Sequence, residues 1–165
     1  MCGPGSSITT SLIGSLQDAL PRTWDILRSS NLTVHPAVYG VVLSGSRGPK
    51  GGFRPDSDID LTLLVDPEAL ARAPERNRLL RDVVELTLLN WESPVELDTV
   101  AAFARSGCRL ECFRCASHAD LECPLERPDC VGLYKTQKGY DGIVPDIGLR
   151  IRDVYPMTLV WARAG

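Results

Sequence analysis

Residues 41–65 read VVLSGSRGPKGGFRPDSDIDLTLLV, and this stretch decides the fold. The apolar run over 38–43 predicts a buried strand, which the small residues of 44–46 end in a tight turn. A polar loop rich in glycine and proline follows over 47–57. Alternating polar and apolar residues then predict a second strand over 58–65. The stretch therefore predicts two strands joined by a long loop that begins in a turn open to phosphate.

Two carboxylates begin the second strand, one residue apart. Asp58 and Asp60 lie on one face and Ile59 lies on the other, because side chains alternate along a strand. The two carboxylates are about 7 Å apart along the chain and repel each other unless a cation lies between them. Hard divalent ions such as Mg²⁺ bind carboxylate oxygens together with substrate phosphates. The pair therefore indicates metal-dependent phosphoryl chemistry.

A third carboxylate is expected from a further strand over 95–100. Glu96 and Asp98 share one face of this strand, opposite Leu97. A site with two metal ions usually needs such a third acidic ligand. We predict Asp98, which follows the longer apolar lead-in, and keep Glu96 as the alternative because both residues have the same phase.

The order of these motifs, an apolar strand, Gly-Ser, a gap of about ten residues and Asp-apolar-Asp-apolar, resembles the nucleotidyltransferase superfamily related to DNA polymerase beta. The resemblance covers Val41 to Val65 and, more weakly, Val95 to Val100. It implies that the turn binds the nucleoside triphosphate and that the carboxylates bind Mg²⁺ or Mn²⁺. The residues carried over are Gly45 and Ser46 for phosphate, and Asp58, Asp60 and Asp98 for metal and catalysis.

The basic residues of the loop add one candidate ligand. Arg47, Lys50 and Arg54 are the cations of this loop, and such residues are more often solvated than bound to a ligand. Arg47 directly follows the phosphate turn, so we predict that it contacts the nucleotide.

The reaction implied by the resemblance is transfer of a nucleoside monophosphate from a nucleoside triphosphate to a hydroxyl acceptor, with release of pyrophosphate. The match is closest to the compact members, which include antibiotic nucleotidyltransferases and small enzymes paired with helical partner proteins. The acceptor, whether small molecule, protein or RNA, is left open. The alternative function is a non-catalytic or regulatory module of the same fold, antitoxin-like, that acts through a protein partner.

Cysteines form a second cluster, since five of the six lie between Cys108 and Cys130. A Cys-x-x-Cys pair has the ligand spacing of tetrahedral zinc sites. We predict a structural zinc ion bound by Cys112, Cys115, Cys123 and Cys130, with His118 able to replace one thiolate. Disulfides and thiols without metal are the alternatives.

Composition fits one compact domain. The chain has 165 residues, of which 44% are hydrophobic and 24% charged. A net charge of −3 gives no overall attraction to nucleic acid. No stretch is apolar enough to span a bilayer, and the N-terminus lacks the features of a signal peptide, so we expect no membrane partner and a cytoplasmic location.

The expected fold class is α/β (α+β), with a small mixed sheet flanked by helices and a cysteine-rich C-terminal extension. Helices are predicted over 6–27, with a break at Pro21, and over 67–91. Closing strands are predicted over 148–161, split at Pro156. The expected organisation is a single domain with N-terminal helices (1–31), a catalytic core (32–104) and a cysteine-rich tail with closing strands (105–165). The basic and aromatic segment 134–140 suits a solvated hairpin edge better than a nucleotide contact.

Overall fold

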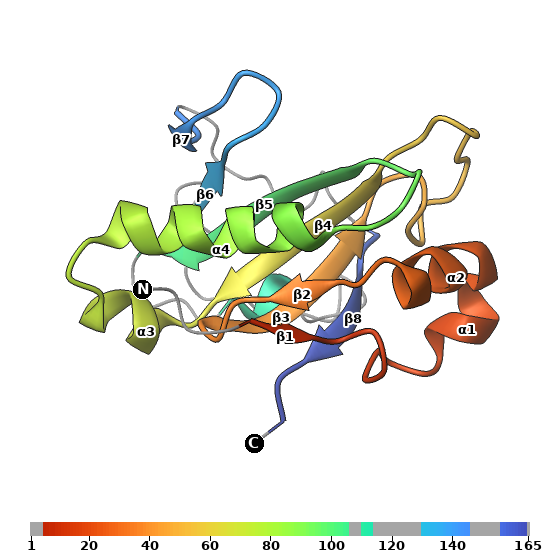
Figure 1. Ribbon diagram of the computed structural model, residues 1–165, viewed down its shortest axis with the longest axis horizontal. Coiled ribbons are helices and arrows are strands. Elements are labelled where there is room, and N and C mark those ends of the chain that lie inside the picture. The colour runs from red at the N-terminus through yellow and green to blue at the C-terminus, as the bar shows by residue number, and fades with distance from the viewer. Residues whose placement is uncertain (1–4, 106–109, 114–129, 146–155, 165) are drawn as a thin grey trace.

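A computed structural model describes residues 5–105, 110–113, 130–145 and 156–164 (Figure 1). These residues form a mixed α+β fold built on one six-stranded sheet. Its strands are β3 (Val38–Ser44), β4 (Ile59–Val65), β5 (Leu97–Ala104), β6 (Val131–Lys135), β7 (Gly142–Ile143) and β8 (Thr158–Ala162). They are arranged in the order β7-β6-β5-β4-β3-β8, which confirms the predicted mixed sheet with flanking helices.

The three central strands of the sheet bring the predicted site residues of 45–60 close to those of 96–98. β3 and β4 are antiparallel, as expected for strands joined by a loop, whereas β4 and β5 are parallel. Parallel neighbours need a crossover connection, which here contains α3 (Pro67–Arg72) and α4 (Arg76–Asn90). This confirms the helical connection predicted over 67–91.

Each face of the sheet has its own apolar cluster. The larger cluster lies between the sheet and α4, whose Leu80 and Val83 are buried with alternate residues of β4, such as Leu61. Figure 1 shows α4 lying across β4 and β5. The opposite face carries a smaller cluster that includes Leu64 and Ala102. Since strand residues alternate, Asp60 and Asp98 share the parity of this second face, away from α4.

The N-terminal segment differs from the prediction. Instead of helix from residue 6 onward, Ser6–Ser7 form the short strand β1, which pairs with β2 (Thr33–Val34) in a separate two-stranded sheet. Helix begins only at α1 (Leu16–Ala19) and continues in α2 (Pro21–Ser29). The run of serines and threonines over 6–11 favours local turns over helix, because hydroxyl side chains compete for backbone hydrogen bonds. Proline opens α2, in keeping with its preference for a first helical turn.

The C-terminal part of the chain joins the central sheet. β6 pairs with β5, and β8 pairs with β3, so the expected closing strand after Pro156 is confirmed. Two of the predicted zinc ligands, Cys112 and Cys130, are buried in the second apolar cluster. The other two, Cys115 and Cys123, lie outside the described residues, as do 148–155, and the zinc site stays a prediction.

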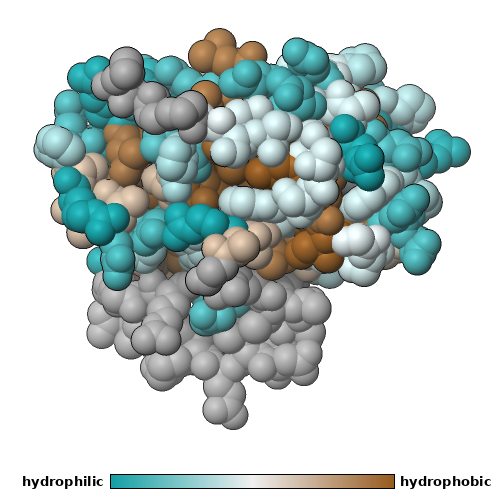
Figure 2. Space-filling model, turned by 60° about the horizontal axis from the view of Figure 1, so that its bottom comes forward, coloured by the Kyte–Doolittle hydropathy of each residue, from teal (hydrophilic) through white to brown (hydrophobic). Residues whose placement is uncertain are grey.

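Polar and apolar side chains are mixed on the surface shown in Figure 2. Of the large hydrophobic residues among those described, Leu89 at the end of α4 is the most exposed, at 83%. Within the described part of the chain, no helix has the length and hydrophobicity needed to cross a membrane.

Asp66, the residue after β4, contacts both α3 and Arg163, the residue that follows β8. Its carboxylate accepts a 2.9 Å hydrogen bond from the Glu68 amide, as a helix N-cap, and another of 2.9 Å from the Arg163 guanidinium. Burial raises the pKa of Asp66, but the hydrogen bonds from Arg163 and the Glu68 amide outweigh burial and leave that pKa below its usual value.

Replacement of Asp66 by Ala is expected to reduce the free energy of unfolding at neutral pH by about 1 kcal/mol, because the helix loses its cap. A lowered pKa means that the ionised carboxylate stabilises the folded state, so this contribution disappears as the pH falls through the folded-state pKa. Urea unfolding of both proteins at neutral and acidic pH measures the difference. Asp66→Asn keeps a capping oxygen and should lose less; an equal loss would argue against the cap.

Candidate functional site

The neighbouring strands β3, β4 and β5 bring the end of β3 close to two predicted site residues, Asp60 and Asp98. Ser44 on β3 is the register partner of Asp60 on β4, and Asp60 is the partner of Asp98 on β5. The turn residue Gly45 follows immediately, with a φ of +74° that favours glycine. A Cβ atom on Gly45 would lie 2.0 Å from Asp60 Oδ2, so the backbone of the turn passes directly against this carboxylate.

The structure distinguishes between the two candidates for the third carboxylate. Asp98 lies on β5 directly beside Asp60, and its side chain is 17% exposed. Glu96 precedes the strand and is exposed, while its backbone carbonyl accepts a hydrogen bond from the Ile59 amide. Asp58, Asp60 and Asp98 therefore form the acidic cluster, at the starts of β4 and β5 and on the face away from α4.

The surroundings of Asp60 disfavour its ionised form. Burial, followed by the negative charges of Asp98 and Asp58, raises the pKa of Asp60 to about 6. None of the described residues donates a hydrogen bond to its carboxylate, although the side chain is partly buried. A partly buried carboxylate beside two others, with no donor of its own, is a position that a cation would stabilise.

Two lysines that sequence reasoning left outside the site neutralise part of this charge. Lys135 on β6 donates to Asp98 Oδ1. Lys138, in the turn after β6, lies 2.6 Å from Asp98 Oδ2 and 3.1 Å from Asp58 Oδ2. The segment 134–140 is a hairpin, as predicted, but its two cations face the acidic cluster instead of solvent alone. The signal that could have found them is the pair of lysines in Tyr-Lys-Thr-Gln-Lys-Gly-Tyr.

The lysines donate hydrogen bonds to Asp98, and its pKa shifts in the direction opposite to that of Asp60. Burial alone would raise the pKa of Asp98, but the hydrogen bonds from Lys135 and then Lys138 outweigh burial and hold that pKa below its usual range. In return, hydrogen bonds to Asp98 and Asp58 raise the pKa of the Lys138 ammonium. Asp98 is therefore ionised and held in one orientation, while Asp60 has no hydrogen-bond donor in the part of the chain that the structure describes.

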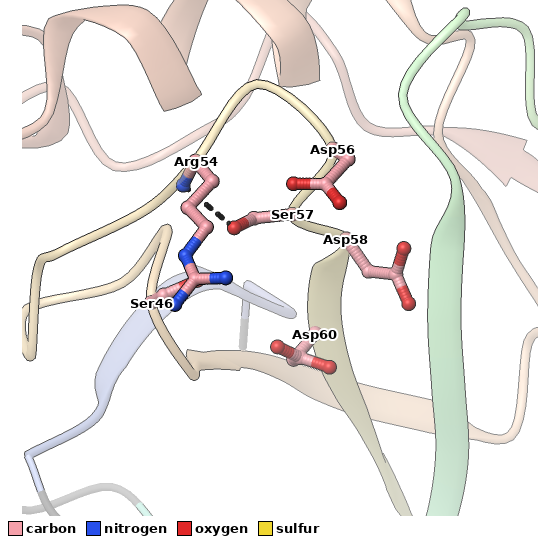
Figure 3. Close-up of a pocket in the computed structure, with 6 residues that line it drawn as sticks. All are labelled: Ser46, Arg54, Asp56, Ser57, Asp58 and Asp60. Carbon is pink, nitrogen blue, oxygen red and sulfur yellow. Dashed lines mark hydrogen bonds between the residues drawn. The ribbon is translucent and has the colours of Figure 1, made fainter.

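An open pocket of about 370 Å³ adjoins the acidic cluster. The residues that line it are Ser46, Arg54, Asp56, Ser57, Asp58 and Asp60. Figure 3 shows the Arg54 side chain extending toward Ser46, across the pocket from Asp58 and Asp60. Among the described residues the Arg54 guanidinium has no hydrogen-bond or ion-pair partner, so this cation is available to an anion in the pocket.

Arg47 occupies a different place from the one predicted. Its side chain is buried at 6% exposure, and its ring contact is with Phe53, 4.8 Å from the ring centroid. The guanidinium donates hydrogen bonds to backbone carbonyls of Arg54, Pro55 and Ser57, at 2.6 to 3.3 Å. The carbonyl of Arg47 in turn accepts a 2.7 Å bond from Thr23 on α2. Arg47 thus fixes the shape of the loop, and Arg54 is the loop cation that lines the pocket.

The acidic cluster suits a hard divalent cation by its chemistry. Its donors are carboxylate oxygens, which Mg²⁺ and Mn²⁺ prefer, and Asp60 lacks another partner among the described residues. The described residues do not, however, include three His, Cys, Asp or Glu side chains already grouped around one metal position. The Lys138 ammonium bridges Asp58 and Asp98 instead.

None of the protein-family models, curated proteins or solved structures compared with the chain matches it.

Proposed function

We propose that this protein is a metal-dependent nucleotidyltransferase. It would move a nucleoside monophosphate from a nucleoside triphosphate to a hydroxyl acceptor and release pyrophosphate. The observation that carries the proposal is the contact between the Gly45 turn and Asp60. In this contact a turn that carries no side chain packs directly against Asp60, a carboxylate with a raised pKa and without a hydrogen-bond donor among the described residues.

Each part of the site has a role in this reaction. The turn at Gly45 and Ser46 would bind the triphosphate, because Ser46 lines the pocket and the absence of a side chain at Gly45 lets the turn lie directly beside Asp60. Arg54, which lines the same pocket, would pair with phosphate oxygens by charge-assisted hydrogen bonds. Arg47 would act indirectly by holding the loop in shape.

The three aspartates would hold the metal and orient the acceptor. Mg²⁺ or Mn²⁺, when bound, supplies positive charge to the triphosphate and the leaving pyrophosphate. Asp60 in β4 and Asp58 directly before it would hold it together with Asp98 from the neighbouring strand β5. Asp98, ionised and fixed by Lys135, would accept the proton of the attacking hydroxyl directly or through water. Catalysis would arise from positioning and from electrostatic stabilisation.

The second candidate is a regulatory module of the same fold that acts through a protein partner. The observation that favours it is the pair of ammonium groups on Asp98, since an internal cation can replace a metal that a non-catalytic protein no longer binds. Against it stand Asp60, which has no donor among the described residues, and the open pocket beside it. The same binding experiment separates the two candidates.

The direct test is isothermal titration of the full chain with non-hydrolysable nucleoside triphosphates, with and without Mg²⁺. We expect Mg²⁺-dependent binding in the native chain and its loss in the Asp58→Ala/Asp60→Ala double variant, because the metal bridges carboxylates and phosphates.

The control variant is Asp18→Ala/Asp25→Ala, which makes the same change in net charge at two exposed residues of α1 and α2. It should bind like the native chain. Equal binding by the native chain and the Asp58→Ala/Asp60→Ala variant, or no binding by either, would contradict the proposal. Co-purification of a stoichiometric protein would then support the regulatory module.

A further inference from the structure

Lys138 occupies the position in the acidic cluster that a bridging cation would take. Its Nζ atom lies within ion-pair distance of Asp58, the residue before β4, and of Asp98 in the neighbouring strand β5. The cluster thus combines three carboxylates with two ammonium groups, Lys135 and Lys138. Like-charged oxygens at such distances need a positive charge between them, and the chain supplies that charge itself.

The two lysines differ in their freedom to move. The Lys135 side chain is 10% exposed and belongs to β6, where the backbone pairs with Gly142. The Lys138 side chain is 54% exposed and lies in a turn. Lys138 can therefore leave the carboxylates by rotating its own side chain, whereas moving Lys135 would leave a buried charge unpaired.

The backbone under Lys138 is held in place by Gln137. The Gln137 side-chain amide donates to the Leu97 carbonyl at 2.9 Å and accepts from the Thr99 amide at 3.0 Å. These two bonds attach the turn to β5 on both sides of Asp98. A further backbone bond, from Tyr140 to the Gln137 carbonyl, closes the turn with both central residues at positive φ. The turn is thus fixed, and only the end of the lysine side chain is exchangeable.

We infer that Lys138 is an internal counter-cation which the divalent metal displaces, so that lysine and metal compete for the same oxygens of Asp58 and Asp98. This inference rests on the proposed function and adds to it a mechanism by which the chain limits binding of the metal alone. The metal alone would bind weakly, because it must first displace the ammonium group. A triphosphate would favour the exchange, since the displaced ammonium can then pair with phosphate oxygens near the turn.

The test is Mn²⁺ binding without nucleotide, followed by the electron paramagnetic resonance signal of free Mn²⁺. We expect Lys138→Met to bind Mn²⁺ about tenfold more tightly than the native chain, because the competing charge is gone while solvent screens part of its effect. Lys138→Gln should show the same direction, and Lys138→Arg, which keeps the charge, should remain weak. Lys50→Met, at an exposed loop position, is the matched control and should leave the affinity unchanged.

The outcomes separate this inference from the proposed function. Tighter binding in Lys138→Met that is lost again when Asp60→Asn is added supports the exchange. Equal or weaker Mn²⁺ binding in Lys138→Met and Lys138→Gln, with dependence on Asp58 and Asp60 retained, overturns the exchange and leaves the metal site standing. Binding that does not depend on Asp58 and Asp60 in any variant overturns both.

Discussion

Replacement of Asp60 by Asn is expected to lower the rate of nucleotide transfer by about a thousandfold or more, while the metal-free protein becomes more stable. The loss follows from removing a metal ligand, since a metal contributes several kcal/mol to the stabilisation of the transition state. The gain follows from removing a carboxylate that burial and two neighbouring charges already penalise. Opposite changes in activity and stability are typical of residues retained for function.

The pH dependence of this stability has a defined sign. The pKa of Asp60 rises from 3.8 to about 6 on folding, so between these values the folded chain binds a proton more readily than the unfolded chain. Its free energy of unfolding therefore falls as the pH rises through this window. Asn carries no charge, so the advantage of Asp60→Asn should be absent below the window and reach about 1–2 kcal/mol above it, after allowance for solvent.

Urea unfolding in the presence of a chelator, at pH values below and above this window, measures the gain. Transfer is measured as release of pyrophosphate once an acceptor is known, and until then through Mg²⁺-dependent nucleotide binding. Asp56→Asn is the control, because Asp56 lines the same pocket but is exposed and stands outside the strand. A variant at Asp60 that kept full turnover would exclude this residue from the metal site.

Gly45→Ala should combine the loss of the site with the loss of several kcal/mol of stability. An alanine Cβ would meet Asp60 Oδ2 at 2.0 Å and Cγ at 2.9 Å, so the turn or the carboxylate must move. The φ of +74° adds the strain of a left-handed conformation. Together these effects are expected to cost about 2–4 kcal/mol and to weaken nucleotide binding strongly.

Gly51 offers a matched control for this substitution. It has the same φ of +74°, and a Cβ atom there would have no neighbour within 4 Å. Gly51→Ala thus measures the conformational strain alone, about 1 kcal/mol, and the remainder in Gly45→Ala measures the clash. In an Asp60→Ala background, Gly45→Ala should cost only slightly more than Gly51→Ala, because the Cβ of residue 60 remains at 3.3 Å while the carboxylate is gone. A full cost in that background would show that Asp60 is not the obstacle.

The parts of the fold that follow local rules could be read from the sequence. Apolar runs and alternation gave β3, β4 and β5, and the long amphipathic stretch gave the crossover with α4. The segment over 6–11 could not be predicted in the same way. Ile8 is its one apolar residue, so it has no apolar period of its own, and pairing of Ser6 and Ser7 with β2, a partner distant in sequence, decides the structure at its start.

The features of the site likewise divide into those that follow from local sequence and those that depend on contacts distant in sequence. The placing of Asp58 and Asp60 on one face follows from period two, and their distance from Gly45 in sequence is short. The choice of Asp98 over Glu96 needed the register between β4 and β5, which no single strand contains. The exchange of roles between Arg47 and Arg54 needed the path of the loop. Whether Lys138 faced solvent or the acidic cluster depended on Gln137 bonding to β5.

The ion pair between Lys138 and Asp58 also bears on how this chain acquires its function during folding. Gly45, Asp58 and Asp60 belong to two strands and a loop that are consecutive in the sequence, so their contacts are local compared with those made by β6. The bond from Lys138 to Asp58 closes a separation of 80 residues, and the bond from Lys138 to Asp98 closes one of 40. Half of the site is thus local and half depends on contacts distant in sequence, so we expect metal and nucleotide binding to report completion of the whole sheet during refolding.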